Sequence, residues 1–413
     1  MSRELRSILV AIVAATGCGG DDVALEPISI GVVTPNTGDL VANGRNQQEA
    51  LLLAVEEINR DGGVLGRPLA LEVRDDGSTA AGAVAAYAGL VADVPVVLGP
   101  NHSAGVVALA AEIRAAGTLT ISGSATSPAI TALDDGGYFF RTVPSDTVQT
   151  IVMADRIVDA GRHNVCLVYR NDAYGAGVAG ALRARLAGRG VELVDAGYDP
   201  TGPSLEGVMD ACDPVLAVPD PGVVFVTFAG DGRLILDSAA AHGWSTASQR
   251  IFIVGNRQQP MFDALSHIDA FEHAICTAAS GPDPQSTAGL RRQRFLDRFH
   301  ARFDHPPTTY AESHYDSAYL AAVAIEIAGS TDDRRAIRDA LGLTSAGPVV
   351  GAGDWAGLRA AIAQHGQVDY TGASGEVNID LDYGELLPPY YVRLWTLEDG
   401  QIVDQDVVTV TAQ

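Results

Sequence analysis

Short apolar, β-branched segments alternate with amphipathic segments along most of the chain. The segment 46–59 is typical of a helix, because Leu51, Ala54 and Ile58 recur on one helical face. Asp61, Gly62 and Gly63 then end it. In this first block the pattern predicts strands at 28–33, 69–73, 94–98 and 118–122, helices at 46–59, 80–92 and 104–116, and a short helix from Pro128.

A second block repeats this rhythm. It predicts helices at 146–160, 175–188, 204–212 and 231–242, a short helix near 260–266, and strands at 164–169, 191–195, 223–228 and 250–254. Strands separated by helices of this length indicate parallel sheets with right-handed crossovers. We therefore expect an α/β protein with two doubly wound lobes.

The pattern changes after residue 275. Helical periodicity predicts three helices without new parallel strands between them, and β-like runs close the chain. The predicted helices are 287–303, 309–329 and 332–341. The β-like runs are 375–379, 390–397 and 402–410. We expect this part to return and cover existing lobes, which gives discontinuous lobes: 28–142 plus 275–372, and 143–274 plus 373–413.

The amino terminus carries an export signal. Arg3 and Arg6 precede an apolar run at 8–15, which is shorter than the roughly 20 residues that span a bilayer. This order predicts a signal peptide over 1–17. Ala15-Thr16-Gly17-Cys18 is similar to the bacterial lipobox, so we expect lipidation at Cys18 and a tether over 18–27. The alternative is an ordinary cleavage site with an unrelated cysteine nearby.

Composition and charge narrow the function. A chain of 413 residues fits two domains, and 47% hydrophobic residues can form their cores. All 27 basic residues are arginines, and the formal net charge is −24. Such a charge excludes binding to nucleic acid and to anionic membrane surfaces unless a basic patch exists, and no dense run of arginines occurs.

Three cysteines remain after Cys18, so they cannot all pair. Export permits a disulfide. Cys166 lies in an apolar run and is expected in the core, whereas Cys212 and Cys276 could form a bridge. The sequence has no CxxC or Cys/His cluster, and its nine histidines are scattered, so we expect no metal and no cofactor.

The segment 94–105 combines a strand, a tight turn and a helix start. We expect Ser103 to cap the helix, whose free N–H groups can bind an anion. Two alternatives are a plain cap and the nucleophile of a serine hydrolase. The G-x-S-x-G pattern of that class is not met, because Asn101 occupies the first glycine position.

A similar arrangement follows the next predicted strand. Ser122, Ser124 and Thr126 place hydroxyl groups at the carboxyl end of a parallel strand, where ligands bind in open α/β sheets. Ser127 before Pro128 is typical of a helix start. A polar loop that only caps its helix is the alternative.

The segment 175–180 matches G-x-G-x-x-G, and Asp195 follows at a suitable distance for a ribose contact. The match argues little for a nucleotide, because residues 170–174 separate the strand from the first glycine. Tyr174 is the more interesting residue here, as an aromatic side chain at a strand end.

From 28 to 403 the sequence resembles the type I periplasmic solute-binding proteins of branched-chain amino-acid transporters, in which a hinge of three strands joins two doubly wound lobes. The segments that carry the resemblance are 54–68 (AVEEINRDGGVLGRP), 121–128 (ISGSATSP), 172–175 (DAYG), 315–319 (YDSAY) and 370–375 (YTGASG).

The resemblance implies a ligand clamped between closing lobes. Ser103 and Thr126 would bind its carboxylate, and Ser124 would offer a backbone carbonyl to an ammonium group. Tyr174 and Phe228 would cover it from the second lobe. The ligand-binding set implied in this way is Asn43, Ser103, Ser124, Ala125, Thr126, Tyr174, Phe228, Asp231 and Arg257.

Two positions depart from the family pattern. Arg257 stands where the family has an acidic partner for the ammonium group, and Asn43 replaces an aromatic residue at the entrance. Asp231 could take the acidic role; otherwise Arg257 favours an anionic ligand such as a small organic acid.

The resemblance implies a protein that is not an enzyme. We expect the periplasmic, lipid-anchored and monomeric binding component of an ABC importer, which delivers an amino-acid-like or small carboxylated solute to an inner-membrane permease. One alternative is an outer-membrane lipoprotein of the same fold that activates cell-wall synthases, because Gly19 permits that address. A serine hydrolase that uses Ser103 is the other.

Overall fold

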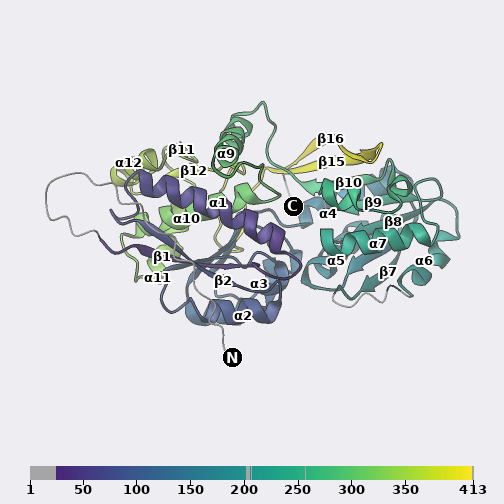
Figure 1. Ribbon diagram of the computed structural model, residues 1–413, viewed down its shortest axis with the longest axis horizontal. Helices are drawn as coiled ribbons and strands as arrows, with labels where there is room; N and C mark the ends of the chain where they lie inside the picture. The colour runs from purple at the N-terminus through teal and green to yellow at the C-terminus, as the bar shows by residue number, and fades with distance from the viewer. Residues whose placement is uncertain (1–24, 201–204, 206, 256, 412–413) are drawn as a thin grey trace. The chain divides into compact units, whose positions relative to one another are not determined.

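The computed structural model describes residues 25–200, 205, 207–255 and 257–411. The predicted signal peptide, Cys18 and most of the predicted tether therefore lie outside the described residues. The chain divides into two compact units (Figure 1). The described residues of Met1–Ala125, Ala132–Val143 and Pro284–Leu387 form unit 1, and those of Thr126–Thr131, Pro144–Asp283 and Pro388–Gln413 form unit 2.

Unit 1 is built on a parallel sheet with strand order β2-β1-β3-β4-β5. Its central strands are fully buried, as expected for a sheet covered on both faces. The strands are β1 (Ile28–Thr34), β2 (Leu69–Asp75), β3 (Val96–Leu98), β4 (Leu119–Ser122) and β5 (Phe139–Arg141).

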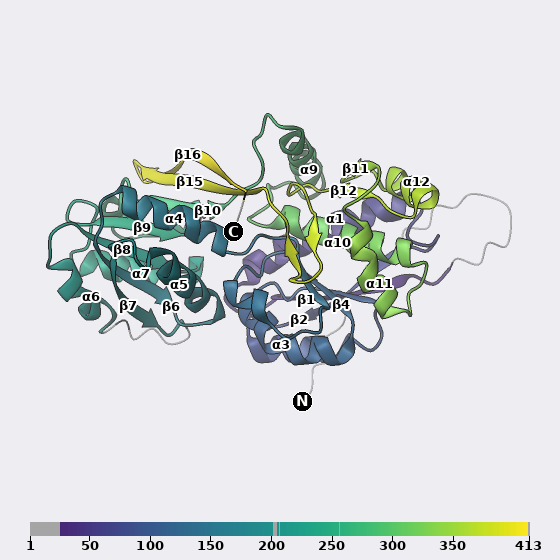
Figure 2. The same cartoon turned by 180° about the vertical axis from the view of Figure 1, so that it is seen from behind.

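Helices cover both faces of this sheet. The long helices α1 (Val41–Arg60) and α10 (Ala311–Ala328) contact each other on one face, and α2 (Ala80–Ala88) contacts α3 (Ser103–Ala116) on the other (Figures 1 and 2). Because α10 also contacts β3 and β4, the expected return of the chain over an existing lobe is confirmed. The remaining elements of unit 1 are α9 (Thr287–Phe303), α11 (Arg334–Ala340), η3 (Leu341–Leu343), α12 (Trp355–His365), and the strand pairs β11 (Val349–Gly351) with β12 (Asp369–Thr371) and β13 (Ile379–Asp380) with β14 (Glu385–Leu386). The short helix η1 (Pro128–Ala132) belongs to unit 2 except for its last residue.

Unit 2 is built on a larger sheet with strand order β16-β15-β10-β9-β8-β6-β7. The five strands from β7 to β10 in this order are parallel, whereas β15 and β16 form an antiparallel ribbon beside β10. The strands are β6 (Asn164–Arg170), β7 (Glu192–Tyr198), β8 (Pro221–Val226), β9 (Arg250–Val254), β10 (Ile275–Ala279), β15 (Tyr390–Glu398) and β16 (Gln401–Val410).

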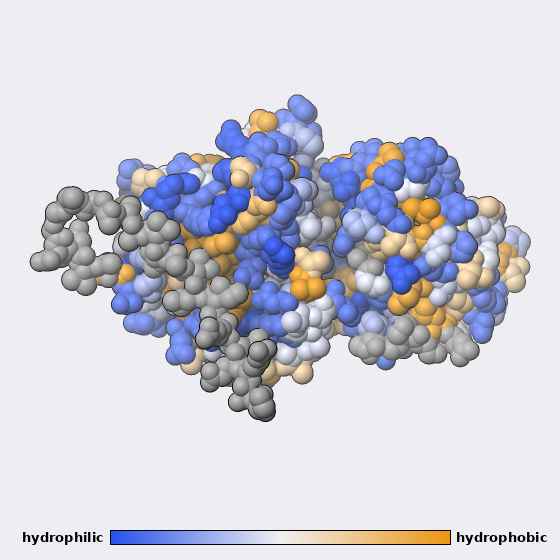
Figure 3. All heavy atoms as spheres, in the orientation of Figure 1, coloured by the Kyte–Doolittle hydropathy of each residue, from blue (hydrophilic) through white to orange (hydrophobic). Residues whose placement is uncertain are grey.

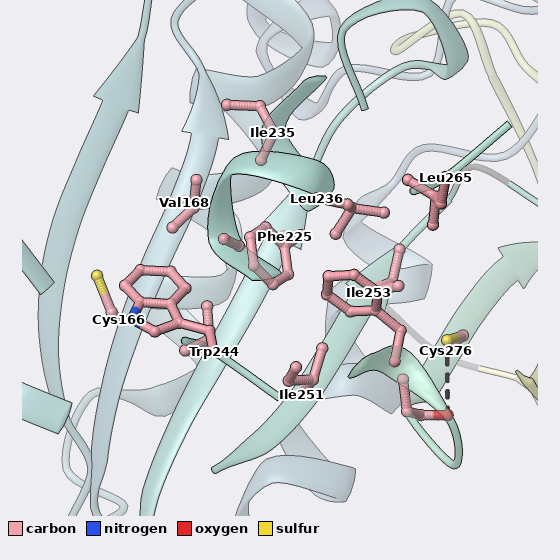
Figure 4. Packing of buried hydrophobic residues seen from close by; sticks show 14 of the residues in the cluster. Cys166, Val168, Phe225, Ile235, Leu236, Trp244, Ile251, Ile253, Leu265 and Cys276 are labelled. Carbon is pink, nitrogen blue, oxygen red and sulfur yellow. Dashed lines mark hydrogen bonds between the residues drawn. The ribbon is translucent and has the colours of Figure 1, made fainter. Parts of the chain in front are cut away.

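The side chains of this sheet alternate between two apolar clusters. On β8, Phe225 belongs to one cluster and Val224 to the other, as the period of two requires. The first cluster includes Trp244, Ile251 and Ile253 around Phe225 (Figure 4). It lies under α6 (Val208–Leu216), α7 (Ala229–Ala241), α8 (Gln259–Asp263) and η2 (Ile268–Phe271), and the second lies under α4 (Thr147–Asp159) and α5 (Ala173–Leu186).

Both sheets reverse their strand order at one point. In unit 1 the chain moves outward in opposite directions from β1 and β3, and in unit 2 it does so from β6 and β8. Loops after the carboxyl ends of such strands diverge, and ligands bind there in open α/β sheets. These two edges hold most of the residues implied by the family resemblance.

Three segments lie in the other unit from the one expected, and Val143 also differs because it belongs to unit 1. Residues 126–131 belong to unit 2, where the Thr126 carbonyl accepts a hydrogen bond from Asp146 N. Residues 275–283 belong to unit 2, because β10 pairs with β9 and β15. Residues 373–387 belong to unit 1, because the β13–β14 hairpin contacts β5. The hairpin docks through Gly384, whose carbonyl accepts a hydrogen bond from the Arg141 N–H at 3.0 Å.

The disulfide differs from the candidate pairing. Cys166 on β6 is bonded to Cys212 on α6, with their Cα atoms 5.4 Å apart, and Cys276 is a buried free thiol. The expected Cys212–Cys276 bridge is wrong because α6 packs beside β6, whereas β9 and β8 separate β10 from β6. The Cys276 thiol instead contacts the Ala274 carbonyl at 3.6 Å (Figure 4).

Hydrophilic residues predominate on the face of the described residues seen in Figure 3, and apolar ones form separate patches there. We find no helix among the described residues that combines the length and apolar character of a membrane span.

Candidate functional site

The start of α3 lies at the carboxyl edge of the unit 1 sheet. Gly99 ends β3 with φ of +100°, and a Cβ there would collide with the Val33 carbonyl, so only glycine fits. Ser103 is the first residue of α3 and is buried, but it is not the cap. That expectation is wrong: His102 has extended backbone dihedrals, and its Nδ1 accepts a hydrogen bond from Gly105 N at 3.0 Å.

The loop after β4 is held by its own hydroxyl groups. Ser122 Oγ donates to the Pro100 carbonyl at 2.6 Å and accepts from Ala125 N at 3.1 Å. Ser124 Oγ donates to the Asn101 carbonyl at 2.6 Å. These bonds fasten the β4 loop to the β3 loop and fix the backbone of Ser124 and Ala125.

His314 supports the same loop from α10. Its Nε2 lies 3.0 Å from Ser124 Oγ, whose hydrogen is already donated to Asn101, so Nε2 must be the donor. Burial lowers the pKa of His314 to about 3, and the imidazole is neutral. A side chain at Gly123 would meet this ring at 2.7 Å. Sequence reasoning missed His314, although the segment 315–319 that carries the family resemblance begins at the next residue.

Arg141 on β5 holds the end of the loop. Its side chain is fully buried, and Nη1 donates to the Ala125 carbonyl at 3.1 Å. Nε donates to Glu385 Oε2 at 3.0 Å, and Nη2 pairs with Glu385 Oε1. The ion pair compensates the buried charge of Arg141, while Nη1 contacts the loop.

Asn43, another of the residues implied by the resemblance, lies in the first turn of α1 and is half-buried.

The continuation of this loop belongs to unit 2. Thr126 is buried, and its carbonyl accepts a hydrogen bond from Asp146 N at 2.8 Å. Ser127 Oγ donates to the Ala173 carbonyl at 2.5 Å and accepts from Ala129 N at 3.2 Å. The predicted start of a short helix at Pro128 is confirmed as η1.

Two aromatic side chains stack at the carboxyl edge of the unit 2 sheet. Asp172 caps α5 by accepting from Tyr174 N and Gly175 N, each at 3.0 Å. The Tyr174 ring stacks on Phe228, with centroids 4.6 Å apart and planes inclined by 21°. Tyr174 is 6% exposed and belongs to the cluster under α4 and α5, whereas Phe228 is half-buried.

Asp231 in the first turn of α7 is already bonded. It accepts from Phe228 N and from Arg170 Nη1, each at 3.0 Å, and from the Tyr198 hydroxyl. Burial and the neighbouring Asp231 carboxylate raise the pKa of Tyr198, so the phenol keeps its proton and donates.

Arg257 follows β9 and pairs with Asp404 on β16. Its Nη2 lies 2.7 Å from Asp404 Oδ1, and Arg393 Nη1 donates to the other oxygen at 3.0 Å. The charge of Arg257 is therefore partly compensated within unit 2.

One candidate metal cluster occurs among the described residues. Ligand atoms of Asp210, Asp213 and His242 lie within 4.8 Å of one another on the surface of unit 2. The 3.1 Å contact of His242 Nε2 with Asp213 Oδ1 is an ordinary exposed ion pair, and we assign no metal to it.

The nine residues implied by the resemblance thus divide between the units. Ser103, Ser124 and Ala125 lie at the carboxyl edge of the unit 1 sheet, with Asn43 on α1. The others belong to unit 2 and lie after strand ends or at helix starts there: Thr126, Tyr174, Phe228, Asp231 and Arg257.

Comparison with known proteins identifies the family. Residues 27–401 match the family model of the periplasmic binding proteins. The substrate-binding protein BasB of a chemotactic signal transduction system in Halobacterium salinarum is 30% identical over 375 residues, which cover 86% of this chain and 84% of BasB. The leucine-, isoleucine-, valine-, threonine- and alanine-binding protein of Pseudomonas aeruginosa is 28% identical, with 80% of this chain and 86% of that protein covered.

Solved structures agree. The branched-chain amino-acid binding protein LivJ of Streptococcus pneumoniae, in complex with isoleucine, matches with a TM-score of 0.74 at 22% identity over 93% of this chain and 100% of LivJ. A substrate-binding protein of Desulfitobacterium hafniense in complex with Leu has a TM-score of 0.65 at 26% identity, over 92% of this chain and 100% of that one. The expected fold is confirmed, and the chain belongs to the periplasmic binding protein family.

Proposed function

We propose that this protein is the extracytoplasmic substrate-binding component of an ABC importer and captures an amino-acid-like or small carboxylated solute. The observation that supports this most is the edge of the unit 1 sheet. There, Asn101, Arg141 and His314 fix the β4 loop beside the start of α3. Rigid backbone N–H groups at a helix start are suited to a carboxylate.

The ligand class stays broad. The partners of Arg257 are consistent with a neutral ligand as well as an anionic one, because Asp404 offsets its charge. Two relatives are named for branched-chain amino acids, and a D. hafniense structure holds Leu. We therefore give amino acids the first place in a screen and small organic acids the second.

A thermal-shift screen tests the proposal. A ligand at a hundredfold excess over its dissociation constant stabilises the folded state by about 2.7 kcal/mol. We expect such a shift with at least one of the L-amino acids or with short mono- and dicarboxylates. Absence of any shift at millimolar concentrations would remove the capture of these solutes.

The partner and the location are part of the proposal. From the sequence we propose that Cys18 is lipidated and anchors the protein in the periplasm. We also propose that the protein is monomeric, that its lobes close on the ligand, and that it delivers the ligand to an inner-membrane permease. Mass spectrometry of the membrane fraction tests the anchor, because a diacyl or triacyl Cys18 has a defined mass. Affinity capture tests the permease.

One second candidate has support from a relative. BasB is the substrate-binding protein of a chemotactic signal transduction system. By analogy, the second candidate function of this protein is to bind a membrane receptor once it carries its ligand. Capture of a receptor in place of a permease would favour this second candidate.

The similar proteins give no support for a cell-wall synthase activator. We propose no catalysis by Ser103, and a Ser103→Ala variant checks this, since no ester turnover should exist for it to abolish.

A further inference from the structure

Arg170, the last residue of β6, joins the starts of two helices in unit 2. Nε donates to Asp172 Oδ2 at 2.7 Å, and Asp172 caps α5. Nη1 donates to Asp231 Oδ1 at 3.0 Å, and the same oxygen accepts from Phe228 N at the start of α7. One guanidinium therefore fixes the two segments that carry Tyr174 and Phe228.

The same guanidinium also lies over one of the two aromatic rings, because its Cζ is 3.9 Å from the centroid of the Phe228 ring. The Tyr174 ring stacks on Phe228 with its plane inclined by 21°, and we call these three side chains the column. The guanidinium adds a cation–π contact to Phe228. This column lies at the point where the strand order reverses between β6 and β8.

The surroundings leave the column little freedom. The Arg170 side chain is 14% exposed, and a Cβ at Gly175 would collide with the Arg170 carbonyl. Among the described residues, the guanidinium contacts two charged groups, the carboxylates of Asp172 and Asp231. The Tyr198 hydroxyl on β7 donates a hydrogen bond to Asp231. A planar fork with several donors can satisfy both carboxylates and the ring at once, whereas an ammonium group cannot.

We propose that Arg170 is a positioning residue for ligand selection: it sets the plane of Phe228, and through it that of Tyr174, and so determines which side-chain size the aromatic pair accepts. The inference rests on the proposed function, in which Tyr174 and Phe228 contact the ligand. Loss of the cation–π contact lets the Phe228 ring rotate and relaxes the discrimination between large and small ligands.

The test compares affinities for ligands of equal charge and different size. Calorimetry gives the affinity ratio of L-leucine to L-alanine, and of 4-methylpentanoate to propanoate, in wild type, Arg170→Lys and Arg170→Gln. We expect both variants to bring each affinity ratio about fivefold closer to one, because discrimination is relaxed. A change of this size is in line with the loss of a contact of cation–π strength. A partly unfolded variant lowers both affinities equally, so the ratio does not report stability.

A matched control lies on α5. Arg183 also pairs with a carboxylate, Asp195, but it is exposed, and the cation–π contacts found among the described residues do not involve it. Arg183→Lys should keep the wild-type ratio. An unchanged ratio in both Arg170 variants overturns the proposal.

A second readout needs no ligand. With ¹⁹F-labelled phenylalanine, the Phe228 signal is assigned by its loss in Phe228→Leu. We expect this signal to shift or sharpen in Arg170→Lys and to stay unchanged in Arg183→Lys. If wild type binds none of the four probes, the proposed capture of these solutes fails. The fluorine signal then decides alone whether Arg170 positions Phe228. A Phe228 signal that Arg170→Lys leaves unchanged contradicts this positioning role.

Discussion

Arg141 and Glu385 form a buried ion pair although 244 residues separate them along the chain. Their side chains are 0% and 8% exposed. The pair joins the last strand of the unit 1 sheet to the β13–β14 hairpin, and Nη1 of Arg141 donates to the Ala125 carbonyl. The geometry of the β4 loop therefore depends on a hairpin that the chain adds near its end.

We expect Glu385→Gln to destabilise the protein by about 3 kcal/mol, because a buried arginine loses its compensating charge. Urea unfolding followed by circular dichroism measures the change. The variant should also weaken ligand binding, since Arg141 no longer holds the β4 loop in one position.

The pair of Glu56 with Arg302 provides the control. It has the same two residue types in bidentate contact at 2.8 Å, but its side chains are 39% and 48% exposed. Glu56→Gln should change the free energy of unfolding by less than about 1 kcal/mol. Equal effects of the two substitutions would mean that the Arg141–Glu385 pair is not buried in solution.

The disulfide should contribute strongly to the stability of unit 2. Its two cysteines are 46 residues apart, and loop-closure entropy for such a separation corresponds to about 4 kcal/mol. We expect Cys166→Ala with Cys212→Ala to lower the free energy of unfolding by about this amount or less. Protein that begins at residue 25 should show Cys276 as its free thiol when denatured without reductant; a second reactive thiol would contradict the bridge.

Stability should fall between pH 6.5 and pH 4 because of His314. Burial lowers its pKa from 6.5 to about 3, so the unfolded chain binds a proton in this range and the folded protein does not. The contribution is complete above pH 6.5, and about 2 kcal/mol of it is lost at pH 5.

His314→Gln isolates this contribution. Its amide can donate to Ser124 Oγ, but it does not titrate, so the loss of stability between pH 7 and pH 5 should be smaller than in wild type. Asp316, whose burial raises its pKa to about 6, changes stability in the opposite direction and is common to both proteins. Exposed His365, replaced in the same way, should leave the pH profile of wild type intact.

The alternation of strands and helices was predictable because each element carries its own pattern. The helix 287–303 agrees with α9 in both bounds, and 250–254 agrees with β9. Predictions were wrong where local signals conflict. The helix expected at 204–212 is α6 at Val208–Leu216, which begins after Gly207 and contains Pro214. The pattern also missed β5, which has 3 residues, and it missed β10 and α12.

Contacts between distant segments could not be predicted in this way. Periodicity places Cys166 in the core, but it does not say which helix covers that face of β6, so the partner Cys212 was missed. His314 and Arg141 lie far in sequence from the loop that they support. The strand-end pattern pointed to Ser124 and Tyr174, and the resemblance to a family implied their roles, whereas their surroundings required the three-dimensional structure.

Arg257 is the position where sequence and structure lead to different expectations. Taken alone, an arginine in place of an acidic residue favours an anionic ligand. With Asp404 at 2.7 Å and its own side chain 37% exposed, Arg257 forms a surface pair of modest strength. We therefore expect Arg257→Gln to change the free energy of unfolding by less than about 1 kcal/mol and to leave carboxylate affinity within about twofold. Calorimetry with the carboxylates of the screen measures the affinity. A loss of tenfold or more would mean that Arg257 leaves Asp404 to bind the ligand, and it would restore the preference for anions that the sequence suggests.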